Sequence, residues 1–445
     1  MVNVTYDAQN NMQTWVDGEP FTYNGADMGW ILVSAVLVMI MAPGVGLLYS
    51  GLLRRKNALS MVFLSLMVFS MAAIQWFLFG YSLAFSETGN SFIGNFANGG
   101  LVNVDIQPSG SIPVLLFAFY QSMFAGVTQV IVVGGAAERG RILPVMLFLF
   151  AWSIIVYCPV ANWVWNANGW IYQLGDLDYA GGGPVHITSG TASFALSFFL
   201  GKRRGYGTAK LAYRPHSVSH VILGTVFLWF GWFGFNGGSA LGMNLRAVQS
   251  CVATNVAAAT AALTWTAIDY IYTRKLSAVS FCSGVLAGLV AVTPAAGYIG
   301  TPAAMAIGFL GAIACNYATG LKVLLGVDDS VDAFAIHGLG GAAKVYALRP
   351  SPWIQLGYQL AACVTIMAYT FVVSLILLYL VNWIPGCKLR AHEDSEIVGM
   401  DEAESGELLY DFVQIRRDVD DEPPATATAV NSVHSGEKVV REASK

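Results

Sequence analysis

The sequence predicts an all-α protein that crosses a membrane many times. Of its 445 residues, 56% are hydrophobic and only 11% are charged, whereas soluble domains carry about 25% charged residues. Because so few charges cannot cover a chain of this length in water, most of its surface must face lipid. Backbone groups in lipid must pair within a helix or a closed barrel, and the apolar runs here are too long for barrel strands.

The apolar runs set the number of spans. A helix of about 20 residues crosses the hydrocarbon core, and ten runs reach that length: 29–52, 59–85, 111–136, 142–167, 183–201, 217–237, 249–272, 277–298, 300–321 and 353–385. Another run, 331–348, is shorter. Its uncharged part, 333–343, would form about 16 Å of helix, roughly half of the core. The sequence therefore predicts eleven transmembrane helices, of which the tenth is truncated.

Basic residues orient these spans. Placing the N-terminus outside puts thirteen Lys and Arg residues of the connecting loops in the cytosol: Arg54, Arg55, Lys56, Arg139, Arg141, Lys202, Arg203, Arg204, Lys210, Arg214, Arg274, Lys275 and Lys322. The outer side then holds only Arg246, Lys344 and Arg349. Since basic loops stay in the cytosol, we expect a multi-pass protein with an extracellular N-terminus and a cytosolic C-terminus.

Polar segments flank the apolar part, 29–387, which we expect to be the transmembrane domain. Residues 1–28 contain no Lys or Arg and do not resemble a secretory signal, so we expect an extracellular segment. It includes Asn3-Val-Thr, an N-glycosylation acceptor. From Lys388 the chain becomes acidic and then rich in Ala, Thr and Ser. This composition predicts a cytosolic tail, 388–445, that docks on the inner face and is disordered after about residue 421.

Few ionisable side chains fall within or beside the apolar runs, where they are costly and usually functional: Asp178, His186, His337, Asp269 and Glu138. A single His in an apolar helix is most often a hydrogen-bonded core residue. Two of them, each close to glycines, favour a shared polar path, because a neutral imidazole can pass a proton without burying a permanent charge. No third His or Cys ligand has matching spacing, so a metal site is not expected.

Aromatic residues gather at the predicted outer ends of three spans: Tyr120 with Phe124, Trp163 with Trp165, and Trp232, Phe233 and Phe235 followed by Ser239. One interpretation is the interfacial belt of Trp and Tyr that membrane proteins commonly have. The alternative is a cup in which rings and a hydroxyl replace part of the hydration shell of a small extracellular cation. The residues themselves leave both interpretations open.

The composition also excludes several other classes of protein. A net charge of −4 and the lack of a basic stripe argue against nucleic-acid binding. The six cysteines have no CxxC spacing, which argues against a disulfide or zinc framework. The GxxxG formed by Gly284 and Gly288 indicates close helix packing rather than nucleotide binding. Without a nucleophile–base pair, we expect neither an enzyme nor a cofactor.

Six motifs carry a resemblance to a known family: APGVGLLYSGLLRRKNALS at 42–60, GYSLAF at 80–85, GAAERGR at 135–141, LDYAGGGPVH at 177–186, GWFGFNGGSA at 231–240 and DDSVDAFAIHG at 328–338. From residue 27 to about 415 the chain resembles the ammonium transporter, methylammonium permease and Rhesus family. It is most similar to the fungal high-affinity ammonium permeases.

The resemblance implies two inverted halves, a plasma-membrane location and one narrow pore in each subunit of a homotrimer, or of a heterotrimer with related permeases. It gives each candidate residue a role: His186 and His337 as the paired pore histidines, Tyr120, Trp165 and Ser239 as the outer ammonium site with Asp178 below it, and Phe124 and Phe235 as the gate.

Two functions follow from this resemblance. The first is uptake of ammonium or methylammonium, which loses its proton so that ammonia crosses an apolar pore. The second is a non-conducting sensor or regulatory subunit of a permease trimer. The second is motivated by the shortened segment after His337, where the family's tenth helix continues, and by the long tail, which offers a site for a cytosolic kinase.

Overall fold

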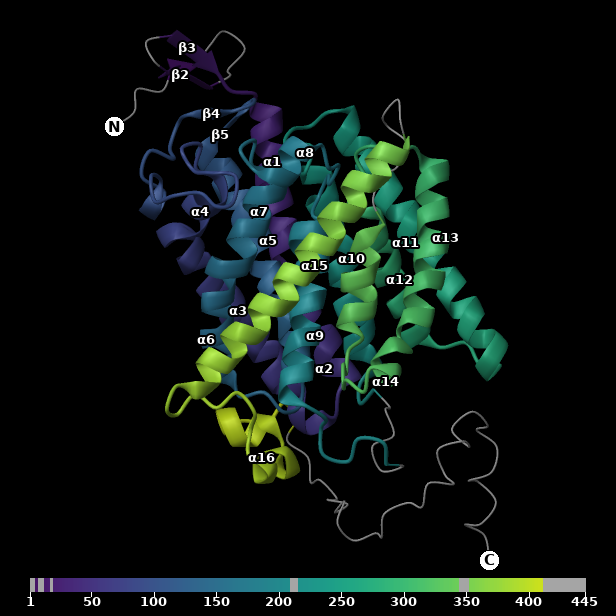
Figure 1. Cartoon of the computed structure of the whole chain (residues 1–445). Coiled ribbons are helices and arrows are strands. Elements are labelled where there is room, and N and C mark those ends of the chain that lie inside the picture. Colours follow the sequence, from purple (N-terminus) through teal and green to yellow (C-terminus); the bar gives the residue numbers. More distant parts are fainter. Residues whose placement is uncertain (1–4, 7–11, 17–18, 209–214, 344–351, 411–445) are drawn as a thin grey trace, which may run out of the picture.

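The computed structural model describes residues 5–6, 12–16, 19–208, 215–343 and 352–410, which form a helical body with a small sheet at one end (Figure 1). We call the end with strands β2 and β3 the sheet end, and the opposite end, which carries α16, the α16 end. Five predictions fall outside the described residues: glycosylation at Asn3, the inner position of Lys210 and Arg214, the end of the short run after residue 343, the outer position of Lys344 and Arg349, and disorder after about residue 421.

The sheet end contains strands that the sequence did not predict. Strands β1 (Thr5–Tyr6), β2 (Met12–Val16) and β3 (Glu19–Thr22) form an antiparallel sheet in that order, with Trp15 paired to Pro20. A second antiparallel pair joins β4 (Pro108–Ser109) and β5 (Ile112–Pro113). The strands have two to five residues, too few for a hydrophobic alternation to be recognised.

Helices make up the rest of the body: α1 (Gly25–Met39), α2 (Met41–Leu52), α3 (Ala58–Gln75), α4 (Tyr81–Phe85), α5 (Val114–Val132), α6 (Ile142–Trp152), α7 (Cys158–Trp165), α8 (Trp170–Leu174), α9 (Thr188–Leu200), α10 (Val218–Gly238), α11 (Leu245–Thr273), α12 (Ala278–Val292), α13 (Thr301–Ala318), α14 (Leu321–Leu324), α15 (Pro352–Trp383) and α16 (Glu393–Val398). Several are joined end to end; α3, for example, continues through a π-helical turn, Trp76–Gly80, into α4.

Eight helices in the described part of the chain are long and apolar enough to cross a membrane. The other predicted spans also correspond to helical segments. Run 183–201 becomes the π-helical turn η6 (Gly182–Ile187) followed by α9, and run 277–298 becomes α12. In the described part of the short run, 331–343, the chain forms the π-helical turn η8 (Phe334–Leu339) and the 3-10 turn η9 (Gly340–Ala342). The protein is therefore an all-α polytopic membrane protein with a shortened tenth segment.

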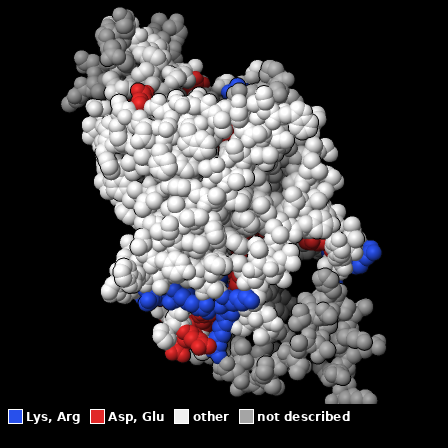
Figure 2. Space-filling model, viewed as in Figure 1, with Lys and Arg blue, Asp and Glu red and all other residues white. Residues whose placement is uncertain are grey.

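The surface agrees with a lipid environment. On the face shown in Figure 2, charged side chains gather near the two ends, and uncharged residues cover the band between them. On α15, which crosses the body diagonally in Figure 1, Val364, Val372 and Ile376 are 65%, 54% and 52% exposed. A helix in water would bury such a row of side chains, whereas lipid solvates it without cost.

Small residues let the helices approach closely. A Cβ atom added to Gly284 would lie 2.7 Å from the Ala261 carbonyl oxygen, and one added to Gly288 would lie 2.5 Å from that of Ala257. Helix α12 therefore packs directly against the backbone of α11. The packing role predicted for the GxxxG motif is confirmed.

The first part of the tail packs against the α16 end of the body. The Asp401 carboxylate accepts hydrogen bonds from the backbone N–H groups of Leu59 and Ser60 at 3.0 and 2.8 Å, at the start of α3. Lys56 Nζ donates to the Glu396 carbonyl at 2.8 Å. A carboxylate at a helix N-terminus satisfies free N–H groups and opposes the positive end of the helix dipole, so this docking stabilises α3 as well as the tail.

Candidate functional site

The two histidines singled out in the sequence occupy equivalent places in two π-helical turns. His186 lies in η6 and His337 in η8, and each follows an aspartate, Asp178 or Asp329, by eight positions. Single π-helical turns are rare and occur frequently at functional sites. The repetition of aspartate, π-helical turn and histidine agrees with the two related halves that the resemblance implies.

Each aspartate caps the turn that follows it. The Asp178 carboxylate accepts the N–H groups of Gly181, Gly182 and Gly183 at 2.9, 2.7 and 2.6 Å. Asp329 Oδ2 accepts the N–H of Phe334 at 3.0 Å. Since these bonds use both oxygens of Asp178, its carboxylate fixes the backbone ahead of His186 and does not project into open space.

Glycines allow the two histidine segments to cross. A Cβ atom added to Gly190 would lie 2.2 Å from the backbone nitrogen of Gly338, and one added to Gly341 would lie 2.6 Å from the Gly182 oxygen. Real Cβ atoms do not approach this closely, so only glycine permits the crossing. The crossing places η8 against α9 and brings residues that are 151 positions apart into contact.

His186 and His337 share a hydrogen bond. Their Nδ1 atoms lie 3.2 Å apart and their rings stack at 25°. Both side chains are buried, and His186 Nε2 has no partner among the described residues. In a neutral pair, one ring must donate through Nδ1–H while the other accepts, so the two imidazoles hold opposite tautomers. Their Nε2 atoms are then one acceptor and one donor.

A column of aromatic rings leads from the sheet end to this pair. The rings of Phe124 and Phe235 are tilted by 31° to each other, with centroids 4.3 Å apart. Below them His186 lies 5.8 Å from Phe235 and is parallel to Trp232, at 5.3 Å and 10°. The Trp232 indole N–H donates to Thr293 Oγ1 at 2.8 Å, which fixes its ring.

The predicted outer-site residues meet above this column. Tyr120 Oη donates to the carbonyls of Gly234 and Phe235, both at 2.9 Å, and lies 3.4 Å from Ser239 Oγ. These bonds tie the Tyr120 ring to the end of α10, because the last turn of a helix leaves carbonyls unpaired.

Trp165 completes the outer group. Its ring lies 5.9 Å from Phe124 in an edge-to-face arrangement, and its indole N–H donates to the Asp178 carbonyl at 3.4 Å. The eight residues to which the resemblance gives a role are therefore linked by contacts from the sheet end to the histidine pair. An interfacial belt does not explain this arrangement.

Two glutamines that the sequence analysis missed brace the Asp178 loop. Gln355 Nε2 donates to the Gly175 carbonyl and Gln359 Nε2 to that of Leu177, at 3.2 and 3.3 Å. Four residues of helix rise about 6 Å, close to the span of two extended residues, so the glutamines match alternate carbonyls. Both side chains are buried. Their spacing of four in an apolar run was the available signal.

The other ionisable residues lie away from the column. Asp269 Oδ1 accepts from Asn316 Nδ2 at 3.0 Å, between α11 and α13. Among the described residues, no group of His, Cys, Asp and Glu side chains is arranged to hold a metal ion.

Glu138 belongs to an ion-pair network at the α16 end. Arg203 bridges Glu138 and Asp328 at 2.9 and 2.8 Å, and Arg54 also binds Glu138 at 2.7 Å. Burial alone would raise the pKa of both carboxyl groups, but these guanidinium groups lower the pKa of each below its ordinary value. The network therefore keeps its charges near neutral pH and joins the α5–α6, α9–α10 and α14–η8 connections.

Comparison with known proteins identifies the family of the chain. The model of the Ammonium Transporter Family matches residues 29–410. Ammonium transporter 1 of Schizosaccharomyces pombe is 48% identical over 432 residues, covering 92% of this chain and 86% of that protein. Ammonium transporter MEP2 of Saccharomyces cerevisiae is 48% identical over 416 residues, covering 87% and 83%.

Solved structures give the same result. The crystal structure of Candida albicans Mep2 superposes with a TM-score of 0.79 at 45% identity and covers 84% of this chain and 88% of that one. A structure described as a Sensor Amt Protein also superposes with a TM-score of 0.79, at 27% identity. The match covers 85% of this chain and 98% of that one. The chain belongs to the Ammonium Transporter Family.

Proposed function

We propose that this protein carries ammonium across the plasma membrane, with methylammonium as a second substrate. The relatives named as ammonium transporters support the substrate, and the column of rings above two hydrogen-bonded histidines supports a route for it. In this proposal the sheet end faces outward, and the cation enters there.

The outer site would select the substrate. Ammonium and potassium are similar in size, so a cavity cannot separate them by size alone; hydrogen bonding and deprotonation can. Tyr120, Trp165 and Ser239 supply ring faces and a hydroxyl, which replace part of the hydration shell of a small cation. Asp178 acts at a distance, by holding the backbone below the site and by lowering the local energy of a cation.

Phe124 and Phe235 would form the gate. Their ring centroids lie 4.3 Å apart below the outer site, and an ion could not keep its hydration while it passed between them. A neutral ammonia molecule loses less solvation than an ammonium ion. The apolar passage therefore favours the deprotonated form.

The paired histidines would guide ammonia beyond the gate. The single observation that carries this proposal is the 3.2 Å contact between His186 Nδ1 and His337 Nδ1. It leaves one Nε2 to accept from ammonia and the other to donate to it, so the molecule keeps hydrogen-bond partners in an otherwise apolar passage. No cofactor enters this scheme.

The replacement His186→Ala tests this role. Removing one buried hydrogen-bonding group costs about 1–3 kcal/mol, so we expect methylammonium uptake to fall by about tenfold or potassium exclusion to weaken. His392→Ala, which alters an exposed histidine at the α16 end, is the matched control and should leave both unchanged. Unaltered flux and selectivity in His186→Ala would remove the histidines from the proposal.

The same proposal covers topology and assembly. We place the N-terminus outside, with glycosylation at Asn3, and the tail in the cytosol, where a kinase can reach it. The protein would assemble as a homotrimer or as a heterotrimer with related permeases. Protease treatment of sealed right-side-out vesicles tests the topology: a C-terminal tag should be protected, and cleavage from the extracellular face would contradict it.

A sensor or regulatory subunit that does not conduct is the second candidate. The shortened segment η8–η9 and the likeness to the Sensor Amt Protein favour it. Expression in a yeast strain that lacks its own ammonium permeases distinguishes the two. Growth on low ammonium supports transport, whereas protein at the cell surface without growth or uptake supports the second candidate.

A further inference from the structure

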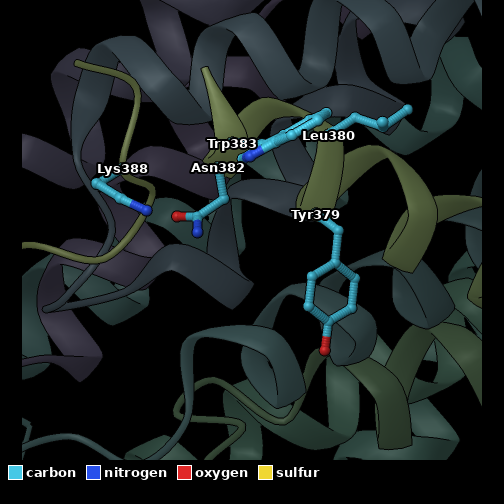
Figure 3. A pocket seen from close by; sticks show the side chains of 5 residues that line it. All are labelled: Tyr379, Leu380, Asn382, Trp383 and Lys388. Carbon is cyan, nitrogen blue, oxygen red and sulfur yellow. The ribbon is translucent and has the colours of Figure 1, made fainter. Parts of the chain in front are cut away.

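A small open pocket lies at the α16 end of helix α15, far from the aromatic column. Its volume is about 360 Å³, and five residues line it: Tyr379, Leu380, Asn382, Trp383 and Lys388 (Figure 3). The polar ends of Asn382 and Lys388 point toward each other, and the indole nitrogen of Trp383 is on their side of the ring. Three kinds of nitrogen donor, an ammonium, an amide and an indole, therefore surround one opening.

The position of Lys388 is fixed by the backbone on both sides of it. The N–H of Leu389 donates to Asn382 Oδ1 at 3.1 Å. Arg141 Nη1 donates to the carbonyls of Gly386 and Lys388 at 3.2 and 3.5 Å. Because Asn382 Oδ1 accepts this bond, its amide nitrogen is left to donate outward. Lys388 is thus held at the pocket although its side chain is exposed.

Lys388 also differs from its basic neighbours. Arg141 pairs with Glu404 at 3.2 Å, and Arg390 pairs with Glu396 at 2.6 Å. Within the part of the chain that the structure describes, Lys388 has no acidic partner. Figure 2 shows Lys and Arg side chains gathered beneath the uncharged band at the α16 end. An anionic group that approaches this pocket would therefore meet a cation that is not already paired with a carboxylate, inside a wider basic region.

The helix side of the pocket continues into the lipid-facing surface. Trp383 and Tyr379 are 84% and 64% exposed, and Tyr379 rests edge-on against Phe199 at 4.9 Å. Further along α15, Leu380, Ile376 and Val372 are exposed at intervals of four residues. Trp and Tyr side chains of this kind lie at the level of lipid headgroups, and the apolar row beyond them extends about 12 Å along α15.

We infer that this pocket binds an anionic phospholipid of the leaflet at the α16 end. The headgroup phosphate lies against Lys388 and accepts from the Asn382 amide and the Trp383 indole. The acyl chains follow Leu380, Ile376 and Val372. A free phosphate ion would use only the first part of this surface, with one lysine in open solvent, so the exposed apolar row favours the lipid. The inference does not depend on transport.

Lipid retention by the purified full-length protein tests the inference. The protein in a neutral detergent is mixed with equal amounts of phosphatidylserine and phosphatidylcholine of identical chains at physiological salt, then repurified. Bound lipid is measured by mass spectrometry. We expect phosphatidylserine to be enriched. Since one basic residue near a membrane surface changes the binding of anionic lipid by about fivefold, Lys388→Ala should lower the enrichment by about that factor.

Three further samples make the result decisive. Lys388→Arg should keep the enrichment, which excludes loss of folding as the cause. Lys275→Ala, an exposed lysine just beyond the end of α11, should also keep it. Millimolar inorganic phosphate should not displace the lipid. Four results would each overturn the inference: equal retention of both lipids, an unaltered phosphatidylserine enrichment in Lys388→Ala, an equal loss of enrichment in Lys275→Ala, or displacement of the lipid by phosphate.

Discussion

The segments that carry His186 and His337 begin alike and end differently. In both, an aspartate caps a π-helical turn of six residues that contains the histidine. The first segment then continues as α9 for 13 residues, whereas the described part of the second, which ends at Ala343, adds the three residues of η9. The histidines still meet at 3.2 Å. Their position therefore depends on the cap, the turn and the glycine crossing, and not on the full length of a span.

The last helix shows what accompanies the shorter segment. Helix α15 has 32 residues, and Ala362, Cys363 and Ile366 pack in one cluster with Ile187 of η6, against which Ala342 of η9 also lies. The glutamines of α15 hold the loop that leads to Asp178. The second segment is thus short, but α15 packs beside it.

The glycine crossing provides the largest test of this comparison. The added methyl group of Gly190→Ala would lie 2.2 Å from the Gly338 nitrogen, and backbone cannot give way as a side chain can. We expect a loss of about 3 kcal/mol or more in stability, seen as a lower melting temperature and little folded protein. Gly357→Ala, with no atom within 4 Å, is the control. A normally stable Gly190→Ala would show that the segments do not cross there.

The two capping aspartates should differ in effect. Asp178→Asn weakens three N–H bonds to a charged acceptor, and Asp329→Asn weakens one. Such bonds contribute about 1.5–3 kcal/mol each, so the apparent affinity for methylammonium should fall by more than about tenfold in Asp178→Asn and by less in Asp329→Asn. Uptake kinetics at matched surface expression give both values. Equal effects of the two replacements would show that the number of hydrogen bonds does not determine the loss of affinity.

The α15 brace predicts a smaller change. Gln359→Leu leaves the Leu177 carbonyl without this donor, at a cost of about 1–3 kcal/mol. We expect the KM for methylammonium to rise by about fivefold while the maximal rate stays within about twofold, because only the loop below the outer site shifts. Gln75→Leu removes a similar bond from another buried glutamine, to the Phe150 carbonyl between α3 and α6. Matching effects in the two variants would indicate a general loss of stability.

The smallest predicted effect is a pH dependence at the α16 end. Tyr410 Oη lies 3.4 Å from His216 Nε2 and 3.3 Å from His220 Nε2. Burial lowers the pKa of His216; the Leu53 carbonyl opposes the shift, and His220 and Arg55 add to it. Folded His216 thus stays neutral where a free histidine, with a pKa of about 6.5, gains a proton. The stabilisation that neutral His216 gives to the folded state is complete above that pH and is lost as the pH falls below it.

Hydrogen exchange of residues 400–410, corrected for intrinsic rates, measures this effect at pH 7.5 and 5.5. Protection should fall at the lower pH in the unmodified protein and change less in His216→Gln. Glu138 and Asp328 should not contribute in this range, because the pKa of each carboxyl group is already lowered. Equal protection at both pH values would refute the role of His216.

The sequence was sufficient for the parts that repeat a strong pattern. Apolar length located the spans and the shortened one, and the family motifs selected His186 and His337, which the fold brings together. Their roles and those of the outer-site residues stay predictions. Three features could not be predicted from the sequence pattern. The strands are too short to show alternation, the π-helical turns differ from α-helix by a single residue, and Gln355 and Gln359 depend on which loop α15 meets.

The central claim, that a shortened second segment still completes a conducting path, is tested most directly by flux into liposomes containing only this protein. Methylammonium uptake and membrane current are recorded together, with potassium as the competing cation and His186→Ala as the comparison. The account predicts saturable uptake above that of empty liposomes, with potassium excluded. Folded protein in the bilayer that gives no uptake above the empty liposomes would contradict it and would favour the non-conducting candidate.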